Sequence, residues 1–213
     1  MKPRLLDLFC GAGGAAMGYH RAGFTVVGVD IRPQPNYPFR FLERDALTLM
    51  ETFLAREDDW FVIDDFDAIH ASPPCEHYAN VTSWRGDTSD HPDLIGPTRE
   101  LLEATGLPWV MENVPEAPLR ADFKLCGTSL GLRVRRHRAF ETNWSGIALA
   151  HPCQHRPDDF AFDHGAKQPE SVYRDAMGCE WMTVVESRDA IPPAFTEFVG
   201  AQLLEHIAAR AAA

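Results

Sequence analysis

A cysteine follows two prolines in the stretch HASPPCEHY at residues 70–78, directly after an apolar run. Pro73 and Pro74 fix their own φ angles and disfavour the helical conformation just before them, so Cys75 is held by a rigid backbone. A rigidly held thiol can serve as a nucleophile, although an ordinary thiol needs help to ionise. A buried structural cysteine is the alternative that this stretch leaves open.

The sequence DLFCGAGG at residues 7–14 is typical of a strand that passes through a glycine turn into a helix. Glycines let backbone amides approach a ligand closely, and the following helix N-terminus favours a negative group. Asp30 ends the next apolar run, about 20 residues after the first glycine, where an acid can bind ribose hydroxyls. The pattern predicts a ligand such as NAD or S-adenosylmethionine, and a glycine turn without a ligand is the alternative.

Two further stretches carry charged side chains. MENVPE at residues 111–116 places Glu112 among apolar neighbours, where a carboxyl can keep its proton or donate it to a base, or can have a structural role. RVRRHRAF at residues 133–140 is the densest basic patch and suits phosphates or a base carbonyl oxygen. Strand alternation would place Arg136 and Arg138 on one face and Arg135 on the other, although a solvated strand face is the usual fate of such a run.

Apolar runs alternate with helical segments, which predicts an α/β fold with a doubly wound, mostly parallel sheet and helices on both faces. We expect strands at residues 4–9, 24–30, 39–45, 66–72, 108–114, 123–127 and 135–143, and helices at 13–23, 46–56, 94–106 and 191–213. Residues 145–189 have weak periodicity and are interpreted as loop-like. Cys75 reaches the crevice above the glycine loop only if the 66–72 strand lies beside the 4–9 strand.

The length of 213 residues suits one domain, and the net charge of −11 argues against a protein that coats nucleic acid indiscriminately. Five scattered cysteines without a CxxC pair suit a reducing cytoplasm, and no apolar run approaches the roughly 20 residues of a membrane span. We interpret His151, Cys153 and His155 as ordinary loop residues, and Cys126 as a core or loop residue. The spacing of His151, Cys153 and His155 is tighter than in zinc fingers, and no second cluster is obvious in the sequence, so we predict no metal.

Taken together and in this order, the glycine loop, the acid of VVGVD, SPPC, ENV and the RxRxF-type segment resemble the cytosine-C5 DNA methyltransferases of bacteria and phages. The resemblance covers residues 4–143, and IPPAFTEFVG is similar to the closing motif of the family. It implies a Rossmann-like sheet that binds S-adenosylmethionine, a DNA substrate with a flipped cytosine, and a cytoplasmic monomer of the restriction–modification type.

The resemblance also implies roles for individual residues. Cys75 would add to C6 of the cytosine, Glu112 would hold N3 and the exocyclic amine, and Arg138 with Arg136 would lie near the base O2. For the methyl donor, Phe9 would stack near the adenine, Asp30 would hold the ribose and Asp45 would approach the adenine amine. The other implied donor-binding residues are Gly11, Gly13, Gly14, Ile31 and Pro74.

The sequence departs from the family in three places. Val134 stands where the family usually has Gln, SRDAIPPAF lacks the usual Gly-Asn, and residues 144–189 are too few for a large target-recognition domain. We therefore divide the chain into a catalytic, donor-binding domain at 1–143, a loop-rich insert and possible reduced recognition region at 144–189, and a helix at 190–213 that packs back on the catalytic domain. Specificity would come from the insert or an accessory partner, and DTSDHPD at 87–93 could close on the flipped base.

Three alternatives stay open from the sequence. The same chemistry could act on RNA or on a free cytosine nucleotide, because the insert is short and the chain is acidic. A catalytically silent DNA-binding relative is the second alternative, although the intact Cys75, Glu112 and Arg138 speak against it. An NAD-dependent oxidoreductase is the third, and it leaves SPPC and ENV unexplained.

Overall fold

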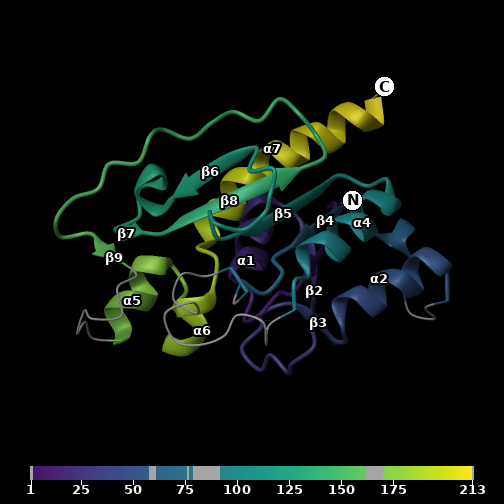
Figure 1. Ribbon diagram of the computed structural model, residues 1–213, viewed down its shortest axis with the longest axis horizontal. Helices are drawn as coiled ribbons and strands as arrows, with labels where there is room; N and C mark the ends of the chain where they lie inside the picture. Colours follow the sequence, from purple (N-terminus) through teal and green to yellow (C-terminus); the bar gives the residue numbers. More distant parts are fainter. Residues whose placement is uncertain (1, 58–60, 76, 79–91, 162–169, 213) are drawn as a thin grey trace.

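The computed structural model describes residues 2–57, 61–75, 77–78, 92–161 and 170–212 (Figure 1). Its centre is a seven-stranded sheet in the order β3-β2-β1-β4-β5-β8-β6. The pairs among β1 to β5 are parallel, whereas β8 runs antiparallel to both of its neighbours. The strands are β1 (Arg4–Leu8), β2 (Thr25–Asp30), β3 (Arg40–Glu43), β4 (Ala68–Ala71), β5 (Trp109–Asn113), β6 (Phe123–Cys126) and β8 (His137–Thr142). The predicted doubly wound, mostly parallel sheet is thereby confirmed.

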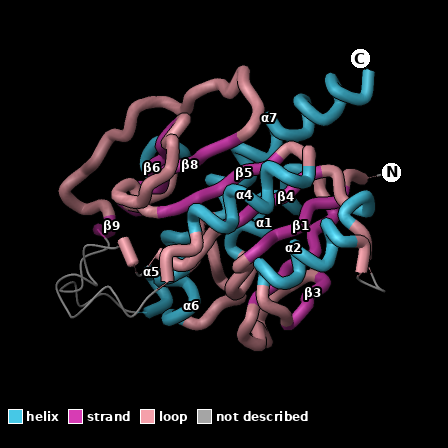
Figure 2. The backbone as a smooth tube through the Cα atoms, turned by 45° about the vertical axis from the view of Figure 1, so that its right-hand side comes forward, coloured by secondary structure: helices cyan, strands magenta, loops and turns pink. Residues whose placement is uncertain are grey.

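Helices cover both faces of this sheet (Figure 2). One face packs against α1 (Gly14–Ala22) and α7 (Pro193–Ala212), which also pack against each other. The other face packs against α2 (Ala46–Ala55) and α4 (Ile95–Thr105). The central strands β4 and β5 are buried along their whole length, as expected for parallel strands covered on both sides.

The helix boundaries follow from local sequence. α1 begins after Gly13 and ends at Gly23, two glycines at positive φ angles of 87° and 125°. The Asp45 carboxylate accepts a hydrogen bond from the Thr48 amide at 2.9 Å and so caps α2. α4 ends at Gly106 in the left-handed conformation. These signals explain why the predicted helices lie within a few residues of the observed ones.

The strand order reverses between β1 and β4, so the loops that follow these two strands leave the sheet in opposite directions. A crevice at the carboxyl ends of the strands opens at such a point and is where open α/β sheets bind ligands. The glycine loop follows β1 and the SPPC loop follows β4, so both border this crevice. The expected adjacency of the two strands is confirmed, with Asp7 paired to His70 and Leu8 to Ala71.

The region at 144–189 has more structure than the sequence analysis expected. The short strands β7 (Val134–Arg135) and β9 (Phe160–Ala161) pair, and two helices follow, α5 (Glu170–Met177) and α6 (Val184–Asp189). Thr183 and Glu186 form a reciprocal capping box at the start of α6, a T-x-x-E signal that sequence reasoning missed. The described residues also include two short 3-10 helices, η1 (Ile63–Asp65) and η3 (Gly127–Leu130). None of the helices within the described ranges has the length and apolar character needed to cross a membrane.

Candidate active site

The SPPC loop is fastened to the carboxyl ends of the two neighbouring strands, β1 and β5. The Ser72 amide donates to the Leu8 carbonyl at 3.2 Å, and the Ser72 hydroxyl donates to the Phe9 carbonyl at 3.3 Å. On the other side, the buried Asn113 amide group donates to the Pro73 carbonyl at 2.8 Å. Cys75 itself is partly exposed, so the loop presents a thiol at the crevice instead of burying it. The sequence analysis did not assign Asn113 a role, although it is the central residue of the ENV motif.

Glu112 and Arg138 form an ion pair at the edge of the crevice. The Arg138 Nε lies 2.7 Å from the Glu112 Oε1, and the two side chains are only 14% and 4% exposed. Because β8 runs antiparallel to β5, with Glu112 opposite Phe140, the start of β8 reaches the end of β5. Burial raises the pKa of Glu112, while Arg138 and Arg136 lower it. The carboxyl therefore lies in a site where its protonation depends on the neighbouring guanidinium groups.

Arg136 is buried and links the site to the helices of the insert. One of its terminal nitrogens donates to the Asp189 carbonyl at the end of α6, at 3.2 Å. Its charge also interacts with Cys75, Glu112 and the Tyr173 side chain of α5. Burial lowers the pKa of Arg136 to about 10, so the side chain stays positive at neutral pH. A positively charged neighbour is one of the features that, in general, favour the thiolate form of a cysteine. Of the four predicted catalytic residues, Glu112 and Arg138 are in direct contact, and the charge of Arg136 interacts with Arg138, Glu112 and Cys75.

The glycine loop is held in an unusual backbone conformation. Phe9 and Gly11 have positive φ angles of 58° and 47°, and a Cβ atom at Gly11 would meet no atom within 4 Å. The Asp30 carboxylate accepts hydrogen bonds from the Gly11 amide at 3.0 Å and the Arg32 amide at 2.9 Å. The neighbouring Ile31 is 65% exposed. These features leave open space and an apolar surface beside a fixed carboxylate.

The other predicted donor-binding residues have visible structural roles. A Cβ atom at Gly13 would lie 2.9 Å from the Pro38 side chain, and one at Gly14 would lie 2.4 Å from the Ile191 carbonyl. These two glycines are therefore required for packing, whereas Gly11 borders open space. Asp45 is exposed and caps α2, and Pro74 is exposed next to Cys75.

The insert contacts the glycine loop directly, which the sequence did not predict. The Trp181 indole nitrogen donates to the Ala12 carbonyl at 2.9 Å. The Asn36 side chain donates to both oxygens of Glu186, at 3.1 and 3.0 Å. Ala12 also belongs to an apolar cluster with Met177, Cys179 and Met182. Residues 173–190 thus form one wall of the crevice, and Figure 1 shows α5 and α6 beside the ends of the central strands.

Two buried polar residues lie beneath the glycine loop. Asp7 and His70 are opposite each other on β1 and β4, and both are fully buried. The His70 Nδ1 lies 3.0 Å from the Tyr19 hydroxyl of α1. Burial, followed by the Asp30 carboxylate, raises the pKa of Asp7 well above its ordinary value, and burial lowers the pKa of His70 to about 3. Both shifts favour the uncharged forms, as expected for side chains under the floor of the crevice.

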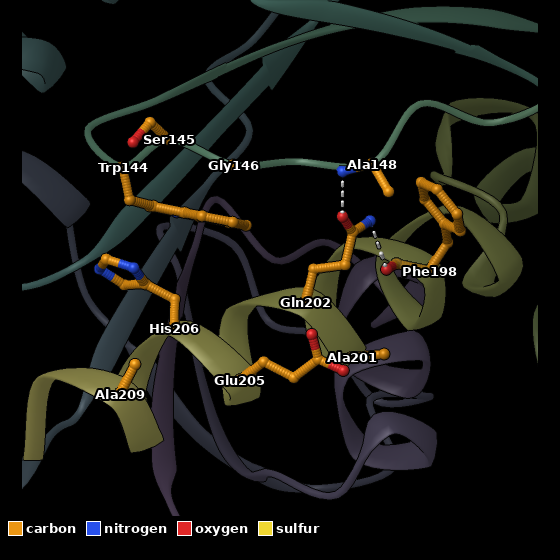
Figure 3. Close-up of a pocket in the computed structure, with 10 residues that line it drawn as sticks. All are labelled: Trp144, Ser145, Gly146, Ala148, Phe198, Ala201, Gln202, Glu205, His206 and Ala209. Atoms are coloured by element: carbon orange, nitrogen blue, oxygen red, sulfur yellow. Dashed lines mark hydrogen bonds between the residues drawn. The ribbon is translucent and has the colours of Figure 1, made fainter. Parts of the chain in front are cut away.

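A separate pocket lies between the segment after β8 and helix α7 (Figure 3). Trp144 stacks on His206 with ring centroids 5.3 Å apart. The Gln202 side chain accepts a hydrogen bond from the Ala148 amide across the pocket and donates one to the Phe198 carbonyl within α7. None of the predicted site residues lines it, so the site described above belongs to the crevice and not to this pocket.

The fold is that of a Rossmann-like S-adenosylmethionine-dependent methyltransferase. The model of the family described as C-5 cytosine-specific DNA methylase matches residues 3–120. This match includes the glycine, SPPC and ENV motifs and more than half of the chain, and the chain therefore belongs to this family.

One curated relative and two solved structures accompany this match. The type II methyltransferase M.AgeI of Thalassovita gelatinovora is 28% identical over 91 residues, which are 39% of this chain and 21% of that protein. The matched stretch thus spans about a fifth of that relative. The S. pombe Dnmt2 methyltransferase superimposes with a TM-score of 0.60 at 14% identity, covering 97% of this chain and 99% of that chain. The Entamoeba histolytica methyltransferase EhMeth gives 0.55 at 12% identity, covering 97% and 98%. These two likenesses describe the fold alone.

Proposed function

We propose that the protein is a DNA cytosine-5 methyltransferase that transfers the methyl group of S-adenosylmethionine to a flipped-out cytosine through a covalent adduct at Cys75. The observation that carries the proposal is the convergence of Cys75, the Glu112–Arg138 ion pair and the glycine loop on one crevice. Family membership supports the same reaction.

The residues of the crevice fit the methyl donor. Asp30 would bind ribose hydroxyls, Phe9 and the exposed Ile31 would offer apolar contacts to an adenine, and the open space at Gly11 would let the chain approach closely. Asp45 and Pro74 would complete the site, with Gly13 and Gly14 shaping the loop. When bound, S-adenosylmethionine supplies an electrophilic methyl group on a sulfonium sulfur.

Cytosine C5 is a weak nucleophile, and the side chains of the crevice can change that. The Cys75 thiolate, favoured by Arg136, would form a bond to C6, and the electron pair of the C5–C6 double bond would become available at C5. Glu112 would hold N3 and the exocyclic amine, and Arg138 would lie near O2, so that charge on the ring is offset. After C5 has accepted the methyl group, a base removes the C5 proton, the double bond re-forms and the bond to sulfur breaks.

The substrate and its surroundings belong to the same proposal. A base inside a stacked duplex cannot reach Cys75, so the enzyme would flip the cytosine out of DNA. Residues 144–189 would supply a reduced recognition surface, with an accessory partner as a second source of specificity. The protein would act as a cytoplasmic monomer. Residues 87–93, suggested as a flap over the base, fall largely outside the described part of the chain.

A transfer assay with tritiated S-adenosylmethionine tests the proposal. Cytosine-containing duplex DNA, a tRNA transcript and dCMP are compared as acceptors, for the wild type and for Cys75→Ser. We expect label in DNA for the wild type only, with donor affinity retained in Cys75→Ser when binding is measured by calorimetry. Label in tRNA or dCMP but not in DNA would overturn the DNA substrate, and no label in any acceptor would favour a silent relative.

A further inference from the structure

Four potential metal ligands meet at the β6 edge of the sheet, beside the start of β8 that carries the arginine segment. They are Cys126 at the end of β6, His137 at the start of β8, and Cys153 and His155 in the segment between β8 and β9. Their ligand atoms all lie within 4.8 Å of one another, and no other group of this kind occurs in the described ranges. We propose that these four side chains bind one structural zinc ion.

The distances within the cluster suit a tetrahedral ion. The Cys126 sulfur lies 3.4 Å from the His155 Nε2, and the Cys153 sulfur lies 3.7 Å from the His137 Nε2. In a tetrahedral zinc site, bond lengths of about 2.3 Å to sulfur and 2.0–2.1 Å to nitrogen place neighbouring sulfur and nitrogen ligands about 3.6 Å apart. The two imidazole rings are 5.1 Å apart at 72° and are not stacked, so both Nε2 atoms can face a common centre.

Two separate chain segments each supply one half of the site. Cys126 and His137 are directly paired across the antiparallel β6–β8 ladder, which places their side chains on the same face. Cys153 and His155 are two residues apart in a segment without helix or strand, a spacing that lets both side chains point the same way in extended chain. Figure 1 shows this segment running from the end of β8 past the β6 edge toward β9.

The sequence analysis rejected zinc because it found only the second half. The pair at Cys126 and His137 was not recognised, since its members lie on different strands and their spacing is not that of a zinc finger. His151, which sequence reasoning grouped with the loop pair, is not part of the cluster.

The main alternative to a metal site is that the four side chains form two separate thiol–imidazole hydrogen bonds and bind no ion. Cys153 and His155 are exposed and lie in a segment without helix or strand, so no regular structure of that segment accounts for their position against Cys126 and His137. The Thr128 hydroxyl lies 3.3 Å from the Cys126 sulfur, where it can donate to a thiolate ligand. Two thiolates and two neutral imidazoles also balance the charge of Zn²⁺ without a further acid.

The geometry indicates what the ion does. Four protein ligands leave no open position, which is typical of structural and not catalytic zinc. His137 lies between Arg136 and Arg138, so the ion would fix the start of β8 that carries both arginines and would tie the 144–159 segment to the edge of the sheet. The site would therefore stabilise the arginine side of the crevice without contacting the substrate.

Metal analysis of the full chain, purified under reducing conditions, tests the proposal. We expect about one zinc ion per chain by inductively coupled plasma mass spectrometry, and tetrahedral Co²⁺ bands with a thiolate charge-transfer band after replacement. Cys153→Ser and His155→Asn change exposed positions, and each should lower bound zinc at least tenfold. His151→Asn, in the same segment but outside the cluster, should keep the wild-type content.

A chelator provides a readout that does not depend on activity. It should lower the thermal midpoint of the wild type and of His151→Asn, and leave that of Cys153→Ser unchanged. The proposal is overturned if wild-type protein that is folded by circular dichroism, incubated with zinc and desalted, holds less than a tenth of an ion per chain. A Cys126–Cys153 disulfide in that same protein, seen as a mass loss of two hydrogens, would also overturn it.

Discussion

Replacing Arg138 by methionine would remove the ion-pair partner of the Glu112 carboxyl and leave Arg136 as its remaining cationic neighbour. The Glu112 side chain is 4% exposed, and Arg138 is its ion-pair partner at 2.7 Å. Methionine keeps much of the arginine's apolar length and removes its charge. The substitution therefore probes what the guanidinium does for a carboxyl that burial already destabilises in its charged form.

The sign of the pH effect follows from the direction of the pKa shift. The pKa of Glu112 is raised in the folded protein, so its contribution to stability is fully present below the unfolded pKa and is lost as pH rises through the folded pKa. Loss of Arg138 raises the folded pKa further and enlarges this loss. Breaking a buried pair costs about 3 to 5 kcal/mol when the carboxyl stays charged. At pH 6 the unpaired carboxyl can take up a proton instead of staying charged. Protonation costs about 1.4 kcal/mol for each pH unit above an ordinary carboxyl pKa of about 4.3, so it limits the loss of stability to about 2 kcal/mol.

Urea unfolding at pH 6.0 and pH 8.5, both above the isoelectric point of 5.2, measures the difference. We expect the deficit of Arg138→Met relative to wild type to be clearly larger at the higher pH. The control is Arg138→Met in a Glu112→Gln background. The deficit of the double variant relative to Glu112→Gln should be the same at both pH values, because neither protein carries the titrating carboxyl. Equal deficits for the single variant at the two pH values would refute the reasoning.

Asn113→Ala removes the 2.8 Å hydrogen bond to the Pro73 carbonyl, so the SPPC loop loses an anchor. We expect a loss of about 1–3 kcal/mol in the free energy of unfolding by urea and a kcat at least tenfold lower. An unchanged kcat would contradict this. Gly11→Ala should weaken donor binding in calorimetry with a stability loss of only about 1–2 kcal/mol from its positive φ angle. Gly14→Ala should instead lower the unfolding midpoint strongly, since its Cβ would lie 2.4 Å from a carbonyl oxygen; the reverse order would contradict the assigned roles. Trp181→Phe removes the hydrogen bond from the indole nitrogen to the Ala12 carbonyl of the glycine loop. We expect a higher Kd for the methyl donor and an unchanged far-UV circular dichroism spectrum. An unaltered Kd would argue against a role of that contact in donor binding.

The sheet could be predicted because its signals are local. Buried parallel strands appear as continuous apolar runs, and Gly23, Asp45 and Gly106 mark helix ends by their own conformational and capping preferences. The adjacency of the SPPC and glycine loops then follows from the reversal of strand order in a doubly wound sheet.

The rest of the site depends on contacts between distant segments. Nothing near Trp181 in the sequence indicates that its indole reaches Ala12, and the partner of Arg136 at the end of α6 is 53 residues away. The four-residue metal cluster needs the β6–β8 register before Cys126 and His137 become a pair. Helix α6 is a different case, because its capping box was present in the sequence.

In the proposed reaction, Cys75 is the nucleophile that attacks a cytosine in DNA. The most direct measurement is covalent trapping with S-adenosylmethionine and duplex DNA that carries 5-fluorocytosine, where fluorine replaces the proton whose removal releases the enzyme. We predict a protein–DNA adduct that survives denaturing electrophoresis, with Cys75 identified by peptide mass spectrometry, and no adduct for Cys75→Ser. An adduct that persists in Cys75→Ser, or methyl transfer to DNA by that variant at the wild-type rate, would exclude Cys75 as the nucleophile.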